Sequence, residues 1–325
     1  MDLPVEKLGR IGVLMGGVSS EREISLKSGQ AIVEALGRRG CEVVGLDITD
    51  GEPEAIRSLL EKSGIDLAFI ALHGRLGEDG TIQSILEDAG IPYAGSGVEA
   101  SRLAINKALA QEMFKKNGIK IPSFVALSRK DPIDIPGAIE ALGGFPVVVK
   151  PACEGSSIGV SFVRTSSELA RAIEDAWQYG DTALIERYIK GKELTVGILG
   201  REALPVVEIC PKRPFFDFEA KYTKGMTDYI VPARIPQDIS DGIQKAALAA
   251  HRVLGCEDIS RVDFILADDQ SHYVLEINTI PGFTATSLLP KAAQHRGIGF
   301  DQLCYQLIVL AYGKKSKIQN ITFRR

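Results

Sequence analysis

Two stretches near the C-terminal end, Arg261-Val-Asp-Phe-Ile-Leu266 and Tyr273-Val-Leu-Glu-Ile-Asn278, decide the fold of the region around them. Successive side chains of a β-strand point to opposite faces, so each stretch is predicted to be a strand with an apolar face and a polar face. The intervening segment 267–272 is short and polar. The two strands are therefore predicted to form an antiparallel hairpin.

The apolar faces predict how these two strands pair. A shift of one residue would turn every side chain to the opposite face and mix polar with apolar residues. The register that avoids this mixing makes three apolar pairs: Val262 with Ile277, Phe264 with Leu275, and Leu266 with Tyr273.

The same register gathers charged and polar residues on the other face of the hairpin. Asp263 is expected opposite Glu276, and Arg261 opposite Asn278. Two carboxylates in such a position, about 5 Å apart at Cβ, repel one another unless a cation is present. Hard oxygen ligands suit Mg²⁺, which proteins typically share with substrate phosphates. The alternative is a solvated polar face on which Arg261 neutralises the two acids.

A lysine and a glycine-rich loop form a second motif upstream. Phe145-Pro-Val-Val-Val-Lys150 is predicted to be a buried strand, at whose end the lysine either reaches the surface or meets an anion. The loop Gly155-Ser-Ser-Ile-Gly159 offers N–H and hydroxyl donors that suit phosphate, although most such loops are plain turns. The sequence has no GxxxxGK[ST] motif, which excludes a P-loop nucleotide site.

A third segment, Gly95-Ser-Gly-Val-Glu-Ala100, matches the pattern GxGxxA of dinucleotide-binding proteins. Such a site also needs an acidic residue at the end of a strand about 20 positions later, and none is found there. A loop before a helix is therefore favoured over a dehydrogenase-like NAD site.

The rest of the chain divides into an alternating part and a strand-rich part. Strands and helices alternate over the first hundred residues, which predicts a parallel α/β layer; the expected strands are 11–15, 41–46 and 67–72, and the expected helices 23–36, 53–61 and 81–89. A helix is expected over 101–117, with Gly118 as its stop. The irregular segment Pro211 to Pro232 is interpreted as a lid.

Composition excludes several classes of protein. The chain has 325 residues, 45% of them hydrophobic, and a net charge of −4, which argues against a broad nucleic-acid-binding surface. No apolar run is long enough to span a membrane, and the N-terminus lacks a signal-peptide core. Its five cysteines are far apart and include no CxxC pair. A disulfide framework is therefore not expected, and a reducing cytoplasm is the expected location.

Together these motifs resemble the D-alanine–D-alanine ligases of the ATP-grasp fold, over nearly the whole chain from Ile11 to Tyr312. The stretches that carry the resemblance are Gly16-Gly-Val-Ser-Ser-Glu-Arg-Glu-Ile-Ser25, Ala71-Leu-His-Gly-Arg75 with Gly77-Glu-Asp-Gly80, Lys150-Pro with Glu154-Gly-Ser-Ser157, Glu219-Ala-Lys-Tyr222, Arg261-Val-Asp263, and Glu276-Ile-Asn-Thr-Ile-Pro-Gly282.

The resemblance implies an α/β fold with α+β ATP-grasp lobes, in three domains. Residues 1–103 would form an N-terminal α/β substrate domain with a parallel sheet, and residues 104–186 the central ATP-grasp lobe. Residues 187–325 would form the C-terminal ATP-grasp lobe, with the lid loop 211–232. ATP would bind between the two lobes.

The resemblance also implies a nucleotide site and a metal site. The residues that would hold ATP are Lys107, Lys150, Ser156, Ser157, Glu186, Arg187, Ile189, Glu193 and Lys221. Arg187 stands where many relatives have lysine, which matters only if the side chain makes the contact. Asp263, Glu276 and Asn278 would bind two Mg²⁺ ions, for which Mn²⁺ could substitute, in agreement with the hairpin argument.

The substrates implied are two D-alanine molecules, joined through a D-alanyl phosphate for peptidoglycan precursor synthesis. Glu21 would bind the first ammonium group, with His73 nearby and with Ser156 and Tyr222 as hydrogen-bonding partners. Ser287 and Leu288 would hold the second carboxylate at a helix start; Arg261 and Gly282 would stabilise the oxyanion. Without the resemblance, each of these residues has a plainer interpretation. These are a helix-start acid for Glu21, a structural histidine for His73, a turn serine for Ser156, a core tyrosine for Tyr222 and a helix N-cap for Ser287.

Three alternatives to a dipeptide-forming enzyme remain. Another ATP-grasp carboxylate–amine ligase would ignore D-alanine, and a nucleotide sensor would bind ATP without turnover. Relatives that make D-alanyl-D-lactate carry phenylalanine where Tyr222 stands, so this tyrosine favours the dipeptide. The resemblance further implies a cytoplasmic homodimer that contacts neither nucleic acid nor membrane.

Overall fold

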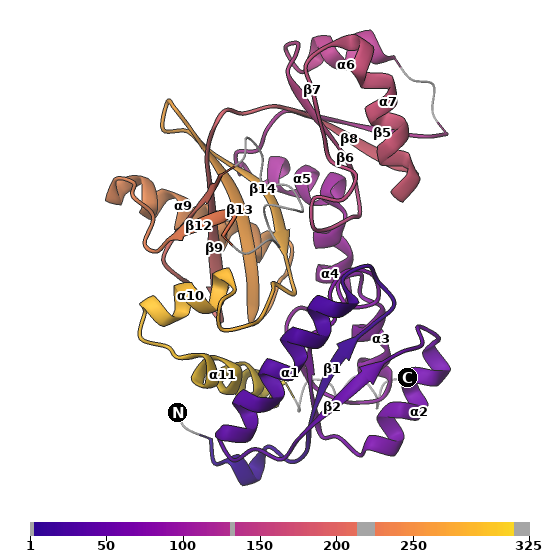
Figure 1. Ribbon diagram of the computed structural model, residues 1–325, viewed down its shortest axis with the longest axis vertical. Helices are drawn as coiled ribbons and strands as arrows, with labels where there is room; N and C mark the ends of the chain where they lie inside the picture. Colours follow the sequence, from indigo (N-terminus) through magenta and orange to yellow (C-terminus); the bar gives the residue numbers. More distant parts are fainter. Residues whose placement is uncertain (1–2, 131–133, 213–224, 315–325) are drawn as a thin grey trace.

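The computed structural model describes residues 3–130, 134–212 and 225–314. Three separate sheets follow one another along this chain (Figure 1). The N-terminal sheet has four parallel strands in the order β2-β1-β3-β4. Its strands are β1 (Ile11–Gly16), β2 (Val43–Ile48), β3 (Leu67–Ile70) and β4 (Tyr93–Ala94), and the helices between them are α1 (Arg22–Arg38), α2 (Pro53–Ser63) and α3 (Thr81–Asp88). This confirms the predicted parallel α/β layer.

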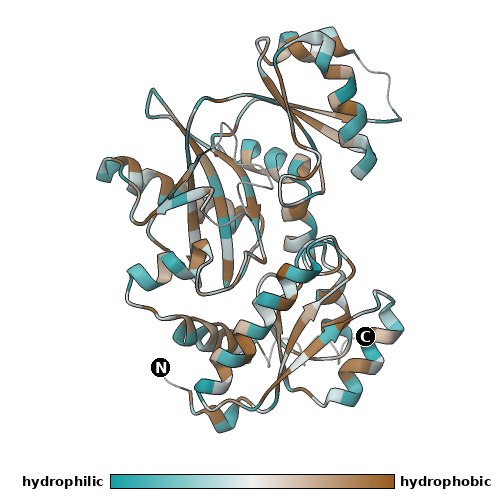
Figure 2. Cartoon of the chain, in the orientation of Figure 1, coloured by the Kyte–Doolittle hydropathy of each residue, from teal (hydrophilic) through white to brown (hydrophobic). Residues whose placement is uncertain are grey.

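The central sheet is small and antiparallel, in the order β5-β8-β6-β7. It is formed by β5 (Phe124–Ser128), β6 (Val147–Pro151), β7 (Ser161–Val163) and β8 (Thr182–Arg187), with the helices α6 (Ile135–Ala141), α7 (Ser166–Ala176) and the 3-10 turn η2 (Trp177–Tyr179). Its valines and leucines form one core cluster with α7. In Figure 2 the apolar colour follows the strands, and polar positions line the outer side of the helices.

The C-terminal sheet has six strands, with β12-β11-β9-β13-β14 in order and β10 beside β9. They are β9 (Gly191–Leu199), β10 (Glu202–Ala203), β11 (Val207–Pro211), β12 (Thr227–Ile230), β13 (Ile259–Ala267) and β14 (His272–Asn278), followed along the chain by α10 (Leu288–His295) and α11 (Phe300–Gly313). The expectation of an irregular lid up to Pro232 is wrong for residues 227–230, which pair with β11. The middle of that segment, residues 213–224, lies outside the described residues.

The hairpin of β13 and β14 has the predicted register at one end and a different one at the other. Arg261 lies opposite Asn278 and Asp263 opposite Glu276, as predicted. A β-bulge then places Phe264 opposite Val274, so the predicted pair of Phe264 with Leu275 is wrong. The pairs beyond the bulge follow the shifted register, with Leu266 opposite His272 in place of Tyr273.

The bulge reconciles two burial requirements on β14. Residues 274 and 276 would share one face of a regular strand, yet Val274 is buried and Glu276 is partly exposed. An extra residue, Leu275, turns the strand between them. Val274 therefore reaches the apolar core under α9 (Gln237–Val253), while Glu276 stays level with Asp263.

The single helix expected over 101–117 is two helices, α4 (Val98–Ile105) and α5 (Lys107–Lys116). Asn106 has an extended backbone, and its side chain accepts a hydrogen bond from the Leu109 N–H, which starts a new helix. Gly118 then ends α5 with a φ of +72°, as predicted. Both helices contribute to the core under the C-terminal sheet.

The Gly95 segment is bound by the protein itself. The Gly95 N–H donates to Asp258 at 3.0 Å, and its carbonyl accepts from Lys314 Nζ at 2.7 Å. Lys314 also lies 2.6 Å from Asp258 Oδ2 and 3.0 Å from Glu257 Oε2. This supports the interpretation as a loop before a helix and not as a dinucleotide site.

The end of the described chain returns to its beginning. Helix α11 packs on α1, β3 and β4, and Figure 1 shows it beside α1. One apolar cluster joins residues of both regions, including Ile11, Ile32, Phe69, Leu303 and Leu307. The N-terminal sheet is thus held directly against α10 and α11, and the 3-10 turn η1 (Val5–Lys7) precedes it.

Candidate active site

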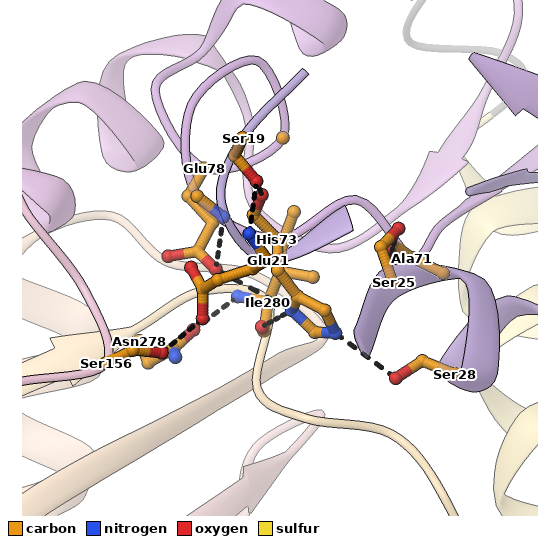
Figure 3. A network of polar contacts seen from close by, with 12 residues as sticks. Ser19, Glu21, Ser25, Ser28, Ala71, His73, Glu78, Ser156, Asn278 and Ile280 are labelled. Carbon is orange, nitrogen blue, oxygen red and sulfur yellow. Dashed lines mark hydrogen bonds and ion pairs between the residues drawn. The ribbon is translucent and has the colours of Figure 1, made fainter. Parts of the chain in front are cut away.

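Glu21 lies at the start of α1 and faces the glycine-rich loop of the central sheet (Figure 3). The Ser156 hydroxyl donates a hydrogen bond to Glu21 Oε1. Ser19 shapes the turn, because its Oγ accepts from the Glu21 N–H at 3.2 Å and donates to the His73 carbonyl at 2.7 Å. The structure thus brings three predicted residues, Glu21, His73 and Ser156, to one place.

His73 is only 5% exposed and uses both ring nitrogens within the protein. Nδ1 lies 3.1 Å from the Ile280 carbonyl oxygen, and Nε2 lies 3.2 Å from Ser28 Oγ. A carbonyl oxygen only accepts, so Nδ1 carries the proton, and in the neutral ring Nε2 accepts from the serine. His73 therefore fastens the end of β3 to the segment after β14 (Figure 3).

Glu78 is a second acid beside Glu21 that the sequence reasoning missed. Its Oε1 accepts from the Gly74 N–H at 3.2 Å and lies 3.8 Å from His73 Nδ1. Burial raises the pKa of the Glu78 carboxyl; the neighbouring His73 ring opposes this rise, and the charge of Glu21 adds to it. Two carboxyl groups at one edge create a negative potential that suits an ammonium group.

The loop between β6 and β7 has an unusual backbone. Ser156 and Ser157 have φ values of +53° and +59°, a left-handed conformation that non-glycine residues rarely adopt. A Cβ on Gly159 would lie 2.8 Å from Pro151 Cγ, so a larger residue would not fit there. Such strain is frequently found at functional sites. Here it accompanies the turn that carries the Ser156 hydroxyl to Glu21.

Two predicted lysines are paired with predicted acids. Lys150 Nζ lies 2.8 Å from Glu186 Oε2, and both side chains are at most 10% exposed. Lys107, the first residue of α5, lies with its Nζ 3.3 Å from Glu276 Oε2 and donates to the Glu154 carbonyl. The third predicted lysine, Lys221, lies outside the described residues, as does Tyr222.

The residues predicted to hold adenine and ribose run from the end of β8 into the start of β9. A pocket of about 260 Å³ lies beside them and is lined by Ile189, Glu193 and eight other residues. Arg187 is exposed, and its backbone N–H donates to the Ser123 carbonyl at 2.8 Å. Glu186 is buried on the Lys150 side of the strand.

The opposed carboxylates of β13 and β14 each have a cationic neighbour. Arg261 Nε and Nη2 donate to Asp263 Oδ1 and Oδ2 at 2.9 and 2.8 Å, and Lys107 pairs with Glu276. The buried Thr195 hydroxyl on β9 also donates to Asp263 Oδ1, at 2.5 Å. Asn278 Oδ1 accepts from the Ile280 N–H at 2.9 Å. Arg261 therefore does neutralise Asp263, as the alternative interpretation of the hairpin proposed.

This donor set fits a divalent cation. Asp263 and Glu276 lie on the same face of adjacent strands, and Asn278 follows on that face. No three or more acidic, histidine or cysteine side chains form a metal-binding group within the described ranges. A cation here would therefore need the Asn278 amide oxygen, which has a second lone pair, and oxygens from a bound phosphate.

Ser287 is the N-cap residue of α10, yet its side chain makes no cap hydrogen bond. Its Oγ instead accepts from the Thr284 N–H at 3.0 Å. The first N–H groups of α10, from Leu288 on, thus have no side-chain cap, which leaves them suited to an anion. Gly282 lies close by, because a Cβ built on it would be 3.5 Å from Ser287 Oγ.

Two further polar residues of the site, Thr195 and Gln111, escaped sequence reasoning. Thr195 lies opposite Asp263 in the pairing of β9 with β13, and only that pairing reveals the contact. Gln111 is one helical turn after Lys107, so an i, i+4 spacing from a predicted lysine was the available signal.

Two family models match the chain, D-ala D-ala ligase C-terminus over residues 113–309 and D-ala D-ala ligase N-terminus over residues 51–96. The curated D-alanine–D-alanine ligase of Geotalea uraniireducens is 46% identical over 311 residues, covering 96% of this chain and 98% of the relative. That of Geobacter sulfurreducens is 47% identical over 306 residues, covering 94% and 95%.

Solved structures of the same kind of enzyme share the fold. The D-alanine–D-alanine ligase from Bacillus anthracis complexed with ATP has a TM-score of 0.82 and 33% sequence identity, covering 95% of this chain and 99% of its own. The VanG D-Ala:D-Ser ligase from Enterococcus faecalis has a TM-score of 0.81 and 32% identity, covering 93% and 99%.

Proposed function

This chain belongs to the D-alanine–D-alanine ligase family of ATP-dependent ligases, and we propose from that premise how its own residues join two D-alanine molecules. The observation that carries the proposal is the pairing of Asp263 with Glu276 on one face of the hairpin. The contact of Glu21 with Ser156 supports it from the other side of the site.

The first D-alanine would bind beside the N-terminal sheet. Its ammonium group would pair with Glu21, which Ser156 orients and whose negative potential Glu78 increases. His73 would keep the two sheets in place around this subsite. The substrate carboxylate would then face the loop that contains Ser156 and Ser157.

ATP would lie between the central and C-terminal sheets. Its triphosphate would meet Lys107, Lys150, Lys221, Ser156 and Ser157, and its base and ribose would meet Glu186, Arg187, Ile189 and Glu193. Two Mg²⁺ ions, or Mn²⁺, held by Asp263, Glu276 and Asn278 would supply neutralisation of phosphate charge. Lys150 and Lys107 face carboxylates in this structure, and they would exchange these partners for phosphate when ATP binds.

The reaction would proceed in two steps. The carboxylate of the first D-alanine attacks the γ-phosphorus of ATP, and ADP leaves with the electron pair of the broken P–O bond. The amine of the second D-alanine then attacks the acyl carbon of the D-alanyl phosphate; the C–O bond to phosphate breaks, inorganic phosphate leaves, and the nitrogen loses one proton. Arg261 and the Gly282 N–H would stabilise the oxyanion, and Ser287 with Leu288 would hold the second carboxylate.

The three-part division at residues 103 and 186 belongs to the same proposal, as does the closing over the acyl-phosphate of the part of segment 211–232 that lies between β11 and β12. Tyr222 would then face Ser156 and Glu21 from that segment. No helix of the described residues is long and apolar enough to cross a membrane. We further propose a homodimer in the cytoplasm that supplies a peptidoglycan precursor and contacts neither membrane nor nucleic acid.

The test uses the purified full chain with ATP, Mg²⁺ and D-alanine. ADP, phosphate and D-alanyl-D-alanine should form in equal amounts. A coupled assay measures the ADP, and mass spectrometry identifies the dipeptide. Competition with L-alanine, D-serine and D-lactate measures the second-substrate preference, since one structural neighbour is a D-Ala:D-Ser ligase. A folded protein that makes neither ADP nor dipeptide would disprove the proposal.

A further inference from the structure

Gln111 is a fully buried polar residue on α5 that the proposed mechanism does not use. It lies one turn after Lys107, on the side of the helix that faces β8 and β14. A buried amide needs hydrogen bonds to both its nitrogen and its oxygen, so each contact of this side chain requires an explanation.

The amide nitrogen of Gln111 has two acceptors, and they belong to different sheets. Nε2 donates to Glu186 Oε1 on β8 of the central sheet, and it lies 3.3 Å from the Leu275 carbonyl oxygen on β14. The opposite orientation of the amide would direct its oxygen at both acceptors. These two contacts therefore fix which end of the amide is the nitrogen.

The Leu275 carbonyl comes from the residue that forms the β-bulge. Leu275 has no pairing partner on β13, so Gln111 supplies a donor from α5 to the irregular point of the ladder. The next residue is Glu276, one of the two opposed carboxylates. Gln111 thus supports the bulge that keeps Glu276 level with Asp263.

The Glu186 contact involves a buried charge. Glu186 is 3% exposed, and its other oxygen lies 2.8 Å from Lys150 Nζ. If Lys150 turns to a phosphate when nucleotide binds, Glu186 loses its counter-ion in a place that water does not reach. A buried carboxylate is tolerated only with compensating donors, and Gln111 provides one.

The oxygen of the same amide has no hydrogen-bond partner among the described residues. A buried acceptor without a hydrogen bond is energetically costly. It is retained only where other contacts of the same side chain fix its orientation. Both hydrogens of the amide are directed to Glu186 and Leu275, which accounts for the orientation that leaves the oxygen unsatisfied.

From these contacts we propose that Gln111 is a positioning residue for nucleotide binding, which holds Glu186 and the Leu275 bulge together while Lys150 exchanges Glu186 for phosphate. The inference rests on the proposed function of the site. Gln111 touches neither substrate in this role and acts through Glu186 and β14.

Two variants of nearly equal volume separate the hydrogen-bonding role from packing. Gln111→Met keeps the volume and removes both donors, so the KM for ATP should rise about tenfold at pH 7.5 with kcat little changed. Gln111→Glu places a second carboxylate beside Glu186 and should raise the KM for ATP further. The pair would then share a proton, so this variant should recover ATP affinity as the pH falls from about 8 to 6.

Gln111→Lys restores a donor to Glu186 and to the Leu275 carbonyl and should return the KM for ATP to within about threefold of wild type. The matched control is Gln244→Met. Gln244 also donates to a backbone carbonyl, that of Leu204 at 2.8 Å, but from α9. The Gln244→Met variant should have a lower melting temperature and an unchanged KM for ATP.

A readout besides turnover is the dissociation constant of a non-hydrolysable ATP analogue with Mg²⁺, measured by calorimetry for each variant. It should follow the KM values, including the pH recovery of Gln111→Glu. An active wild type with Gln111→Met and Gln111→Glu both binding the analogue normally would overturn the inference alone. An inactive wild type would overturn the proposed function instead.

Discussion

Asp263 shows at the scale of one residue how a charged group is held before any ligand arrives. Its oxygens accept from Arg261 and from the buried Thr195 hydroxyl. The guanidinium neutralises the charge, while the hydroxyl adds direction without charge. A cation that binds Asp263 must share the carboxylate oxygens with these donors. Removal of the donors should therefore change the affinity for metal more than it changes stability.

Thr195→Val tests this arrangement. Valine has nearly the same shape and favours strands, so the fold should be retained. The concentration of Mg²⁺ that gives half-maximal ADP release should rise about tenfold, because second-sphere hydrogen bonds typically contribute that much. Thr182→Val, on the central sheet, is the control. An unchanged Mg²⁺ dependence in Thr195→Val would show that the hydroxyl has no such role.

A second residue-scale prediction concerns His251, whose Nδ1 lies 2.7 Å from Ser260 Oγ inside the C-terminal core. Burial lowers the pKa of His251 to about 4 from 6.5, with Arg252 contributing. Below about pH 6.5 the unfolded chain binds a proton at His251, whereas the folded chain binds it only near pH 4. The free energy of unfolding therefore decreases as the pH falls from about 6.5 to about 4.

Urea unfolding at pH 7 and pH 5 checks the sign. The His251 contribution predicts a loss of about 2 kcal/mol between these values. His251→Gln cannot titrate and should show a correspondingly smaller difference between the two pH values, although it is less stable at pH 7. Equal pH dependence in the two proteins would contradict the prediction.

At the scale of elements, the bulge of β14 separates a core position from a site position. Val274 and Ile277 are buried, with two partly exposed residues between them. This spacing of three suits neither a regular strand nor a simple hairpin, and Leu275 is the residue that makes it possible. The extra residue therefore sets the spacing between the buried Val274 and the residues of the site on β14.

Deletion of Leu275 is expected to leave a folded protein. The pairs on both sides of the bulge, Asp263 with Glu276 and Phe264 with Val274, would join into a regular ladder with the same residues on each face. Val274→Ala should instead remove core volume and cost about 2 kcal/mol more. Thermal unfolding compares the two, and equal melting temperatures would argue against this account of the bulge.

Alternation of apolar and polar residues was enough to predict the hairpin and the opposition of Asp263 and Glu276. It failed at Phe264, because the sequence carries no mark of the extra residue and only the packing of Val274 under α9 requires it. The break at Asn106 was likewise missed, since helical periodicity continues through it. Thr195 needed a strand neighbour that no local pattern specifies, whereas Gln111 had only its i, i+4 spacing from Lys107 as a signal.

At the scale of the molecule, a polar cluster joins the N-terminal sheet to the C-terminal sheet. Lys314, which follows α11, contacts Asp258 before β13 and the Gly95 carbonyl after β4. Asp258 has a φ of +58° and is 9% exposed. An ion pair this buried is costly to break from one side, because the remaining charge stays in place.

Lys314→Met should therefore lower the free energy of unfolding by about 3 kcal/mol. The control is Lys130→Met, whose pair with Asp181 is 81% and 69% exposed and should contribute less than about 1 kcal/mol. Chemical denaturation measures both. Similar losses in the two variants would mean that the cluster does not hold the sheets together.

The packing of α11 against α1 and β3 also sets an order of events on the ribosome. Ile11, Ile32 and Phe69 emerge early, whereas Leu303 and Leu307, which complete the same apolar cluster, are made much later. The nascent N-terminal sheet therefore has an uncovered apolar surface until residues 300–313 have been made. Chaperone dependence during synthesis, and its relief by earlier supply of the 300–313 peptide, follow from that delay.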